Sequence, residues 1–364
     1  MFGRTLSLYF ARHFAKMVLS IFMMGFVLIT VVTYIEFFNR ALRGDFTGGF
    51  TLALVALFRV PSVTEDALPF AVLYGSIAAF VVANRRLEVV VTRAAGVSAM
   101  QFLLPACVVG LLIGIVGTTL YNPLAASLLN WSNELTTLVV PSGHRPSSPS
   151  HTGPVWVRQA TKAGESIVGA PQSFDDGLGL IGVTAYVFDH GGKFRERIDA
   201  DRGHYEPGVW RLENALVTAP NATPRKVAVY SLPTNLSTDE VKRTFLQVDS
   251  VSFWSLPSLA ASAQRAGVPG NRFLLQYNVL LSRPILLLAM VLIAANVSLR
   301  FSRSRDVGWM IITGVGVGFM LYVLMKIAWD LGSGGIVPPP LAAWLPAIVA
   351  TLFGITVLLH LEDG

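Results

Sequence analysis

Six separate apolar runs, each long enough to cross a bilayer as a helix, constrain the fold of this 364-residue chain more than any other feature. A helix needs about 20 apolar residues to cross roughly 30 Å of hydrocarbon. The runs are Met17–Tyr34, Ala67–Ala83, Phe102–Tyr121, Asn278–Leu299, Val307–Met325 and Leu341–Leu361. Only 14% of the residues are charged, against about 25% in soluble domains. The sequence therefore predicts a membrane protein with six transmembrane helices.

A polar block separates the third run from the fourth. This pattern divides the chain into residues 1–138 with three helices, residues 139–268 outside the membrane, and residues 269–364 with three more helices. The block opens with a loop-like stretch rich in Pro, Ser and Gly, Pro141–Pro154. Short runs with strand character follow: Val155–Arg158, Gly182–Phe188, Arg197–Tyr205, Val209–Val217, Lys226–Leu232 and Phe245–Phe253. Glu206-Pro-Gly-Val209 has the turn residues of a hairpin. We expect an all-β sandwich or jelly roll inserted in the helical protein.

Basic residues predict the orientation. Cytoplasmic loops carry an excess of Lys and Arg. Such residues precede the first run, separate the second from the third, and separate the fourth from the fifth: Arg4, Arg12, Lys16; Arg85, Arg86, Arg93; Arg300, Arg303, Arg305. Six helices place all three groups on one side. Both termini are therefore expected in the cytoplasm and the β domain on the outer side.

The short loop between the second and third runs has a helical pattern of its own. Leu87, Val90, Val91 and Ala94 fall on one face of a helix, which is typical of an amphipathic segment at a membrane surface. One interpretation is a tight turn whose charges only fix the topology. Glu88 favours a second interpretation, because an acidic residue adds little to topology but can pair with arginines of a docking protein.

No residues in the sequence form a recognisable catalytic, metal or nucleotide site. The only Gly-Lys pair, Gly192-Lys193, is followed by Phe194 and does not fit a phosphate-binding loop. The six histidines are scattered, and the polar block is nearly neutral, so neither a metal site nor a nucleic-acid surface is indicated. We therefore expect a chain without catalytic residues or cofactors. If the chain uses energy, that energy comes from another subunit, and a helix like the one containing Glu88 is what a cytosolic motor would grip.

Two pairs of glycines four residues apart, Gly110/Gly114 and Gly314/Gly318, lie inside apolar runs. Small residues let helices approach closely in lipid. The pairs predict either packing within the chain or, mainly for the second pair, contact with another subunit.

Several segments together resemble the LptF/LptG permease family. They are VPSVTEDALPFAVLYGSIAAF, RRLEVVVTRAAGVSAMQ, SFWSLPSL, LLSRPILLLAMVLIAANVSLRFSR and PPPLAAWLPAIV. The layout of three spans, a β domain and three spans is also similar to that family. The resemblance implies a permease of the Gram-negative inner membrane that extracts lipopolysaccharide, passing it through a periplasmic jelly roll to LptC. Its segments favour the LptG branch; the alternatives are the sister permease LptF and, from another class, an ion-coupled secondary transporter.

The resemblance also implies partners and site residues. An LptF-like permease and two copies of an LptB-like ATPase would complete the transporter, with an LptC-like protein receiving the cargo. Residues 85–98 would form the coupling helix, and the fifth span would contribute to a gate against the second permease. The residues concerned are Arg85, Arg86, Glu88, Arg93 and Gly96 for coupling, and Gly314 and Gly318 for the gate.

Lipid A, a phosphorylated and acylated glycolipid, needs an apolar cavity with cations at its outer rim. Arg40 and Arg43, with Glu36 beside them, are therefore predicted to contact the lipopolysaccharide. Glu36, Asn130 and Asn133 stand where related proteins tend to place basic residues, so phosphate contacts could differ here. Other charges near membrane depth are expected to pair with one another or to contact cargo: Arg59, Glu65, Asp66, Arg283, Lys326 and Asp330. Of these, Lys326 and Asp330 have the spacing of an i, i+4 pair.

Overall fold

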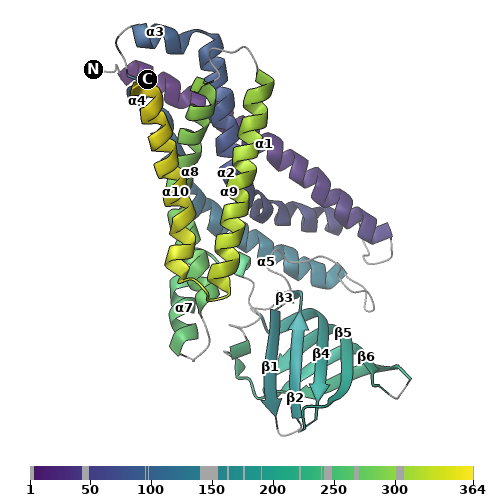
Figure 1. Ribbon diagram of the computed structural model, residues 1–364. Helices are drawn as coiled ribbons and strands as arrows, with labels where there is room; N and C mark the ends of the chain where they lie inside the picture. The colour runs from purple at the N-terminus through teal and green to yellow at the C-terminus, as the bar shows by residue number, and fades with distance from the viewer. Residues whose placement is uncertain are drawn as a thin grey trace.

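The protein consists of a bundle of long helices with one β domain inserted between the third and fourth membrane spans (Figure 1). The computed structural model describes residues 4–42, 49–94, 96, 98–139, 155–161, 164–174, 177–189, 191–220, 223–238, 240–241, 248–265, 270–300 and 307–363. The expected class, a helical membrane protein with an inserted all-β domain, is confirmed.

Among the described residues, six helical segments are long and apolar enough to cross a membrane, as predicted. The long helices are α1 (Arg4–Leu42), α2 (Gly49–Arg85), α4 (Ala99–Val116), η1 (Gly117–Tyr121), α5 (Asn122–Val139), α8 (Asn271–Arg300), α9 (Val307–Ser333) and α10 (Pro339–Asp363). The third span, Met100–Thr136, runs through α4, the π-helical turn η1 and α5 without a break. The helices are longer than the apolar runs because their polar ends continue beyond the apolar windows.

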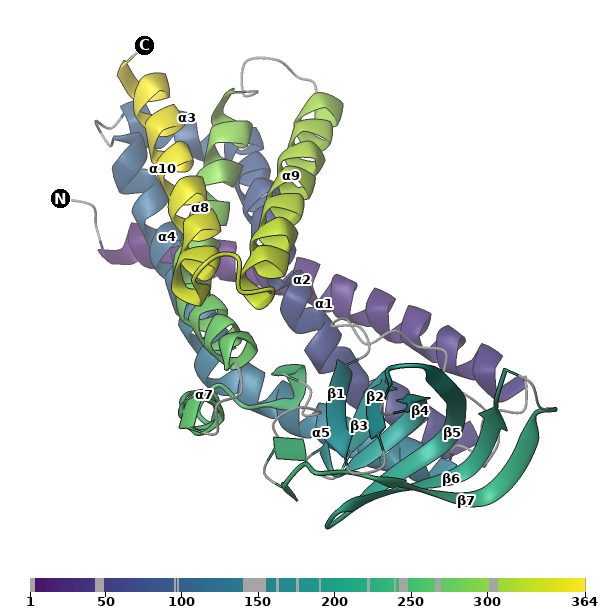
Figure 2. The same ribbon diagram turned by 60° about the horizontal axis from the view of Figure 1, so that its bottom comes forward.

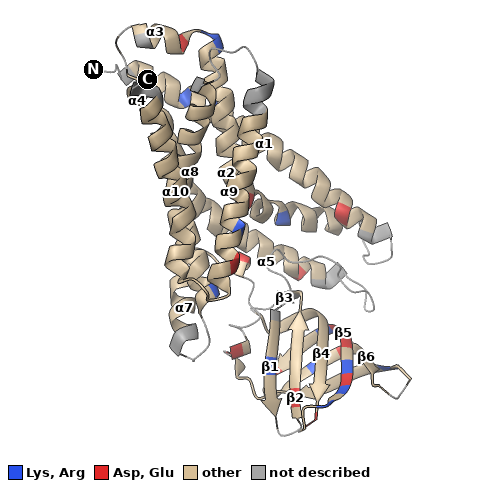
Figure 3. Ribbon diagram, in the orientation of Figure 1, with Lys and Arg blue, Asp and Glu red and all other residues tan. Residues whose placement is uncertain are grey.

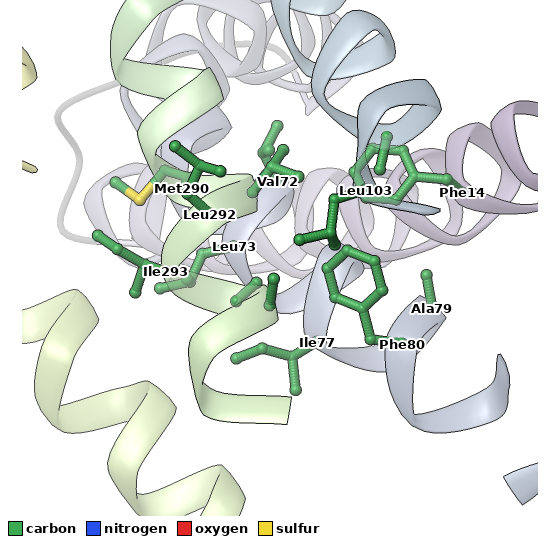
Figure 4. Close-up of a cluster of buried hydrophobic side chains, with 14 of the residues drawn as sticks. Phe14, Val72, Leu73, Ile77, Ala79, Phe80, Leu103, Met290, Leu292 and Ile293 are labelled. Carbon is green, nitrogen blue, oxygen red and sulfur yellow. The ribbon is translucent and has the colours of Figure 1, made fainter. Parts of the chain in front are cut away.

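The helical core forms where α1, α2, α4 and α8 meet. Figure 4 shows Phe14 of α1, Leu73 of α2, Leu103 of α4 and Met290 of α8 in this buried cluster. The helices approach closely at glycines, since a Cβ on Gly110 would lie 2.8 Å from Val291 and a Cβ on Gly114 would overlap Pro284. The predicted packing role of Gly110 and Gly114 within the chain is therefore confirmed, with α8 as the partner helix.

Replacing Gly114 with leucine should force α4 away from α8, because the neighbouring atoms belong to the backbone of Pro284 and cannot move aside. Overpacking of this kind destabilises by about 1–3 kcal/mol, so the midpoint of thermal unfolding of the detergent-solubilised chain should fall. Gly25→Leu is the matched control, since a Cβ at Gly25 meets nothing within 4 Å. Equal unfolding midpoints for the two variants would contradict the packing role.

The described strands form one antiparallel sheet in the order β1-β2-β4-β5-β6-β7, with β3 also paired to β4. The strands are β1 (Val155–Thr161), β2 (Gly164–Ala170), β3 (Gln172–Phe174), β4 (Gly179–Phe188), β5 (Phe194–Glu206), β6 (Val209–Thr218) and β7 (Arg225–Pro233). Figure 2 shows the sheet strongly curved. The predicted hairpin is confirmed, because Glu206 pairs with Val209 and Gly208 has a φ of 86°. This left-handed conformation suits glycine and follows Pro at the position that a tight turn prefers.

Buried and partly exposed side chains alternate along the strands, and the buried ones form the core of the β domain. In β4 the side chains of Val183, Ala185 and Val187 are buried and those between them are partly exposed. Trp210 and Leu212 of β6 are fully buried in the same cluster. One face of the sheet therefore encloses an apolar core, as the period of two residues in the sequence predicts.

The sequence prediction was wrong at both ends of the β domain. The predicted strand Phe245–Phe253 contains instead the 3-10 turn η3 (Val248–Ser250) and a bend, with residues 245–247 outside the described part. The alternating Val251 and Phe253 are buried against helices rather than in the sheet. Strands β2 and β3 and the short helix α7 (Leu256–Arg265) were not predicted. The glycines and small residues of β2 gave it too weak an apolar pattern.

The β domain and the short helix α3 (Glu88–Ala94) lie at opposite ends of the helical bundle (Figures 1 and 2). The ends of the described chain lie at the α3 end. Figure 3 shows the helices almost free of charge over most of their length, with charged residues near α3, near the helix ends and in the β domain.

Candidate functional site

The segment that joins α2 to α4 forms a sharp corner followed by α3. Leu87 has a φ of 58°, a strained conformation for a bulky residue, and its N–H donates to the carbonyl of Asn84. The corner lets α3 begin at Glu88, with only two residues between it and the end of α2 at Arg85. Any force on α3 therefore reaches α2 through a very short connection.

The apolar stripe predicted for this segment is present and faces outward. Leu87, Val90 and Val91 are 60%, 55% and 64% exposed, whereas Val89 and Thr92 are buried toward the bundle. Exposed apolar patches on a helix mark interaction sites. The stripe thus offers a docking surface at the end of the protein opposite the sheet.

Glu88 lies between this surface and α1. Its Oε1 accepts a hydrogen bond of 3.0 Å from the hydroxyl of Tyr9, and Arg86 lies 4.0 Å from the same oxygen. Its Oε2 is buried and has no hydrogen-bond partner among the described residues. Glu88 thus ties α3 to α1 with one oxygen, while the other oxygen is buried without a partner among the described residues; the pairing of Glu88 with arginines of a docking protein stays a prediction.

The other predicted coupling residues surround α3. Arg85 and Arg86 are exposed, and Gly96 has a φ of 80°, which only glycine adopts readily, just after the helix ends. Arg93 lies within α3, but its side chain is outside the described part.

A second polar site, which the sequence did not predict as a unit, is buried inside the helical bundle. The Nη1 of Arg283 in α8 forms an ion pair with Oε1 of Glu65 in α2, and both residues are less than a tenth exposed. Asn122 donates to both carboxylate oxygens of Glu65, at 3.0 and 3.2 Å. Buried charges are stabilised only when paired and hydrogen-bonded, and this pair is both.

Asn122 also connects the ion pair to the segment that returns from the β domain. Its Oδ1 accepts a 2.8 Å hydrogen bond from the N–H of Phe253. The same returning segment is held on the third span by Asn130, which donates to the carbonyl of Ser250, and by Trp254, which donates to the carbonyl of Thr119. A π-helical turn often marks a functional position, and η1 lies directly beside these contacts.

Three of the segments that carry the family resemblance converge on this cluster. Glu65 lies in VPSVTEDALPF, Arg283 in LLSRPILLL and Phe253 in SFWSLPSL. They are far apart in the sequence, and only the fold brings them together around Asn122. Asn130, where the resemblance led us to expect a basic residue, has a local structural role here through its bond to Ser250.

The residues predicted to contact lipopolysaccharide lie near the end of α1. Glu36 is exposed on that helix. Arg40 belongs to α1 but its side chain lies outside the described part, and Arg43 lies outside the described residues altogether. Their contact with cargo therefore stays a prediction.

The glycine pair of α9 packs against α2 of the same chain. A Cβ on Gly314 would lie 2.7 Å from Ile77, and one on Gly318 would lie 3.1 Å from Leu73. Of the two predicted roles, these contacts show packing within the chain for both glycines. A contact of Gly314 and Gly318 with a second permease stays a prediction.

The predicted local ion pair between Lys326 and Asp330 is confirmed, with 3.4 Å between Nζ and Oδ1. Among the described residues, no group of three or more His, Cys, Asp or Glu side chains is placed to hold a metal ion.

Comparison with known proteins identifies the family of the chain. Residues 8–360 match the family described as "Lipopolysaccharide export system permease LptF/LptG". The chain is similar to the lipopolysaccharide export system permease protein LptG of Escherichia coli strain K12, with 22% identity over 96% of this chain and 97% of the relative. The LptG of Escherichia coli O6:H1 strain CFT073 shows the same identity and coverage. Since the family match spans nearly the whole sequence, the chain belongs to the LptF/LptG family of lipopolysaccharide export permeases.

Proposed function

We propose that this chain is the LptG-type permease of a complex with an LptF-like permease, two copies of an LptB-like ATPase and an LptC-like periplasmic protein. The family membership supports a multi-pass, inner-membrane permease subunit for lipopolysaccharide export. The proposal of the LptG branch is based on the resembling segments, and two LptG proteins are among the relatives that align along almost their full length.

The orientation in this proposal follows from charge and from the fold. The basic residues beside α3 favour the cytoplasm, and the β domain lies at the other end of the bundle. The termini and α3 are thus cytoplasmic, and the sheet is periplasmic. The single observation that carries the proposal is the outward apolar stripe of α3, since a separate ATPase needs such a surface to move the permease.

A physical path connects this surface to the β domain. α3 joins α2 through two residues, α2 carries Glu65, and Glu65 is bonded through Asn122 to the segment that leaves the sheet. A displacement of α3 would therefore be transmitted by a continuous helix and by buried hydrogen bonds. In this mechanism the chain holds and moves lipid, and ATP hydrolysis takes place in the partner.

Deleting residues 155–241 should leave ATP hydrolysis by the purified complex measurable but stop transfer of lipopolysaccharide to the LptC-like protein. The deletion removes the strand edges that a periplasmic partner can extend. It keeps Ser250, Phe253 and Trp254, whose hydrogen bonds hold the returning segment on the third span. Transfer is measured by crosslinking of lipopolysaccharide to the LptC-like protein in proteoliposomes.

A longer deletion, to Phe253, is the informative comparison because it also removes the hydrogen bonds of Ser250 and Phe253. It should lower the yield of the complex as well as transfer. Continued transfer by the shorter deletion would contradict the role of the sheet. Transport by the isolated chain under an ion gradient, without any ATPase, would overturn the proposed function itself.

A further inference from the structure

A cavity of about 290 Å³ lies between α2, α8, α9 and α10, near the turn that joins α9 to α10. It is separate from the α3 surface and from the predicted cargo residues of α1. Its polar lining includes Asp249 of η3, Gln276 and Arg283 of α8, and Lys326 of α9, and its apolar lining includes Phe70 and Leu286. The cavity thus opens among membrane spans while one wall comes from the segment that leaves the β domain.

Several polar groups in this cavity have bonding capacity that the protein does not use. The guanidinium of Arg283 has five N–H donors, and only Nη1 has a partner, Glu65, among the described residues. The carboxyl group of Asp249 has no hydrogen bond or ion pair among the described residues. Burial and, to a smaller extent, the charge of Glu65 raise the pKa of Asp249, whereas Arg272 and Arg59 act in the opposite direction. Buried polar groups that lack partners in a protein generally find them in a ligand or water.

The charges on the lining have opposite signs on different elements. Arg283 and Lys326 supply cations from α8 and α9, and Asp66 of α2 and Asp249 of η3 supply carboxyl groups. Lys326 already pairs with Asp330, but both side chains are at least half exposed, and surface pairs of this kind contribute little. An anion alone would meet the two carboxyl groups, and a cation alone would meet the two basic groups. A ligand with one negative and one positive group can pair with the basic and the acidic groups of the lining at the same time.

The size and the lining of the cavity further restrict the kind of ligand that it can bind. A volume of about 290 Å³ accommodates a phosphate ester, a short amine and part of a glycerol. It is too small for a multi-acylated glycolipid. Tyr322 and Trp329 also line it, and aromatic residues with polar tips are typical of the membrane interface.

We propose that this cavity binds the headgroup of a zwitterionic phospholipid, with its phosphate toward Arg283 and Lys326 and its ammonium group toward Asp249. The bound lipid would join η3 to α8 and α9 and so stabilise the position of the returning segment. The inference goes beyond the proposed function and does not depend on it, because it concerns a resident membrane lipid and not the exported cargo.

The test places the purified complex in nanodiscs made of equal parts phosphatidylethanolamine and phosphatidylglycerol. The surrounding lipid is then stripped with detergent, and mass spectrometry measures how much of each lipid the complex retains. Phosphatidylglycerol has the phosphate but no ammonium group. Wild type should retain phosphatidylethanolamine with a preference of about tenfold, as expected for one charged hydrogen bond. Asp249→Asn should abolish this preference.

Two variants of one ion pair give the matched control. Lys326→Gln and Asp330→Asn both break the pair on α9, but only the first removes a cation from the cavity. Lys326→Gln should lower retention of both lipids about tenfold, and Asp330→Asn should leave retention unchanged. Unfolding midpoints confirm that each variant is folded.

Three results would overturn the inference. They are equal retention of the two lipids by wild type, equal effects of Lys326→Gln and Asp330→Asn, and identification of the retained molecule as the glycolipid cargo. None of them bears on ATP-driven export, so failure here is distinguishable from failure of the proposed function.

Discussion

Replacing Val91 with aspartate on α3 should reduce recovery of the ATPase with the permease at least tenfold. Val91 is 64% exposed and lies in the outward stripe with Leu87 and Val90. Burying such a side chain in an interface contributes about 1.5–3 kcal/mol, and an aspartate there would lose this contribution and leave a desolvated charge. Affinity purification of the tagged permease, with the ATPase quantified by gel densitometry, measures the effect.

The control for this substitution makes the same change elsewhere. Val229→Asp alters a valine of β7 that is 41% exposed, and it should leave ATPase recovery intact. Glu88→Ala should weaken docking less than Val91→Asp, because Oε1 of Glu88 is already bonded to Tyr9 and Oε2 is buried. Normal ATPase recovery with Val91→Asp would show that α3 is not the docking surface.

The sequence predicted the features of the molecule that depend only on residues close to one another in the chain. Apolar runs of span length depend only on neighbouring residues, and all six were confirmed. The stripe of α3 and the pair Lys326–Asp330 follow from helical spacing, which the sequence contains directly. The sequence could not show which face of α3 packs against the bundle. In the structure Val89 and Thr92 are buried there, and the apolar stripe faces away.

The buried site could not be predicted because its members meet only through the fold. Arg283 and Glu65 are separated by 218 positions, and each has several other charged residues as possible partners in the sequence. Asn122 carries no motif, yet it bonds residues 57 positions before it and 131 positions after it. The segments that resemble the family contain Glu65, Phe253 and Arg283. Only the three-dimensional arrangement shows that they form one cluster.

Removing one partner of the buried ion pair should destabilise the protein strongly. Arg283→Met leaves the carboxylate of Glu65 buried with Asn122 as its one remaining partner among the described residues. An uncompensated buried charge costs about 3–5 kcal/mol, whereas replacing both charges by apolar groups can be neutral. The single variant should therefore unfold at a lower temperature, and the double variant Glu65→Met/Arg283→Met should recover most of the loss. Thermal unfolding of the detergent-solubilised chain measures both.

The double variant also separates stability from coupling. If Glu65 only stabilises the bundle, a double variant with a restored unfolding midpoint should transfer lipopolysaccharide normally. If Glu65 and Asn122 transmit the movement of α2 to the returning segment, the same variant should hydrolyse ATP but lose transfer, because the methionine cannot accept hydrogen bonds from Asn122. Lys326→Met, which breaks an exposed pair, should shift the unfolding midpoint little. An Arg283→Met variant as stable as Lys326→Met would show that the buried pair does not hold the bundle together.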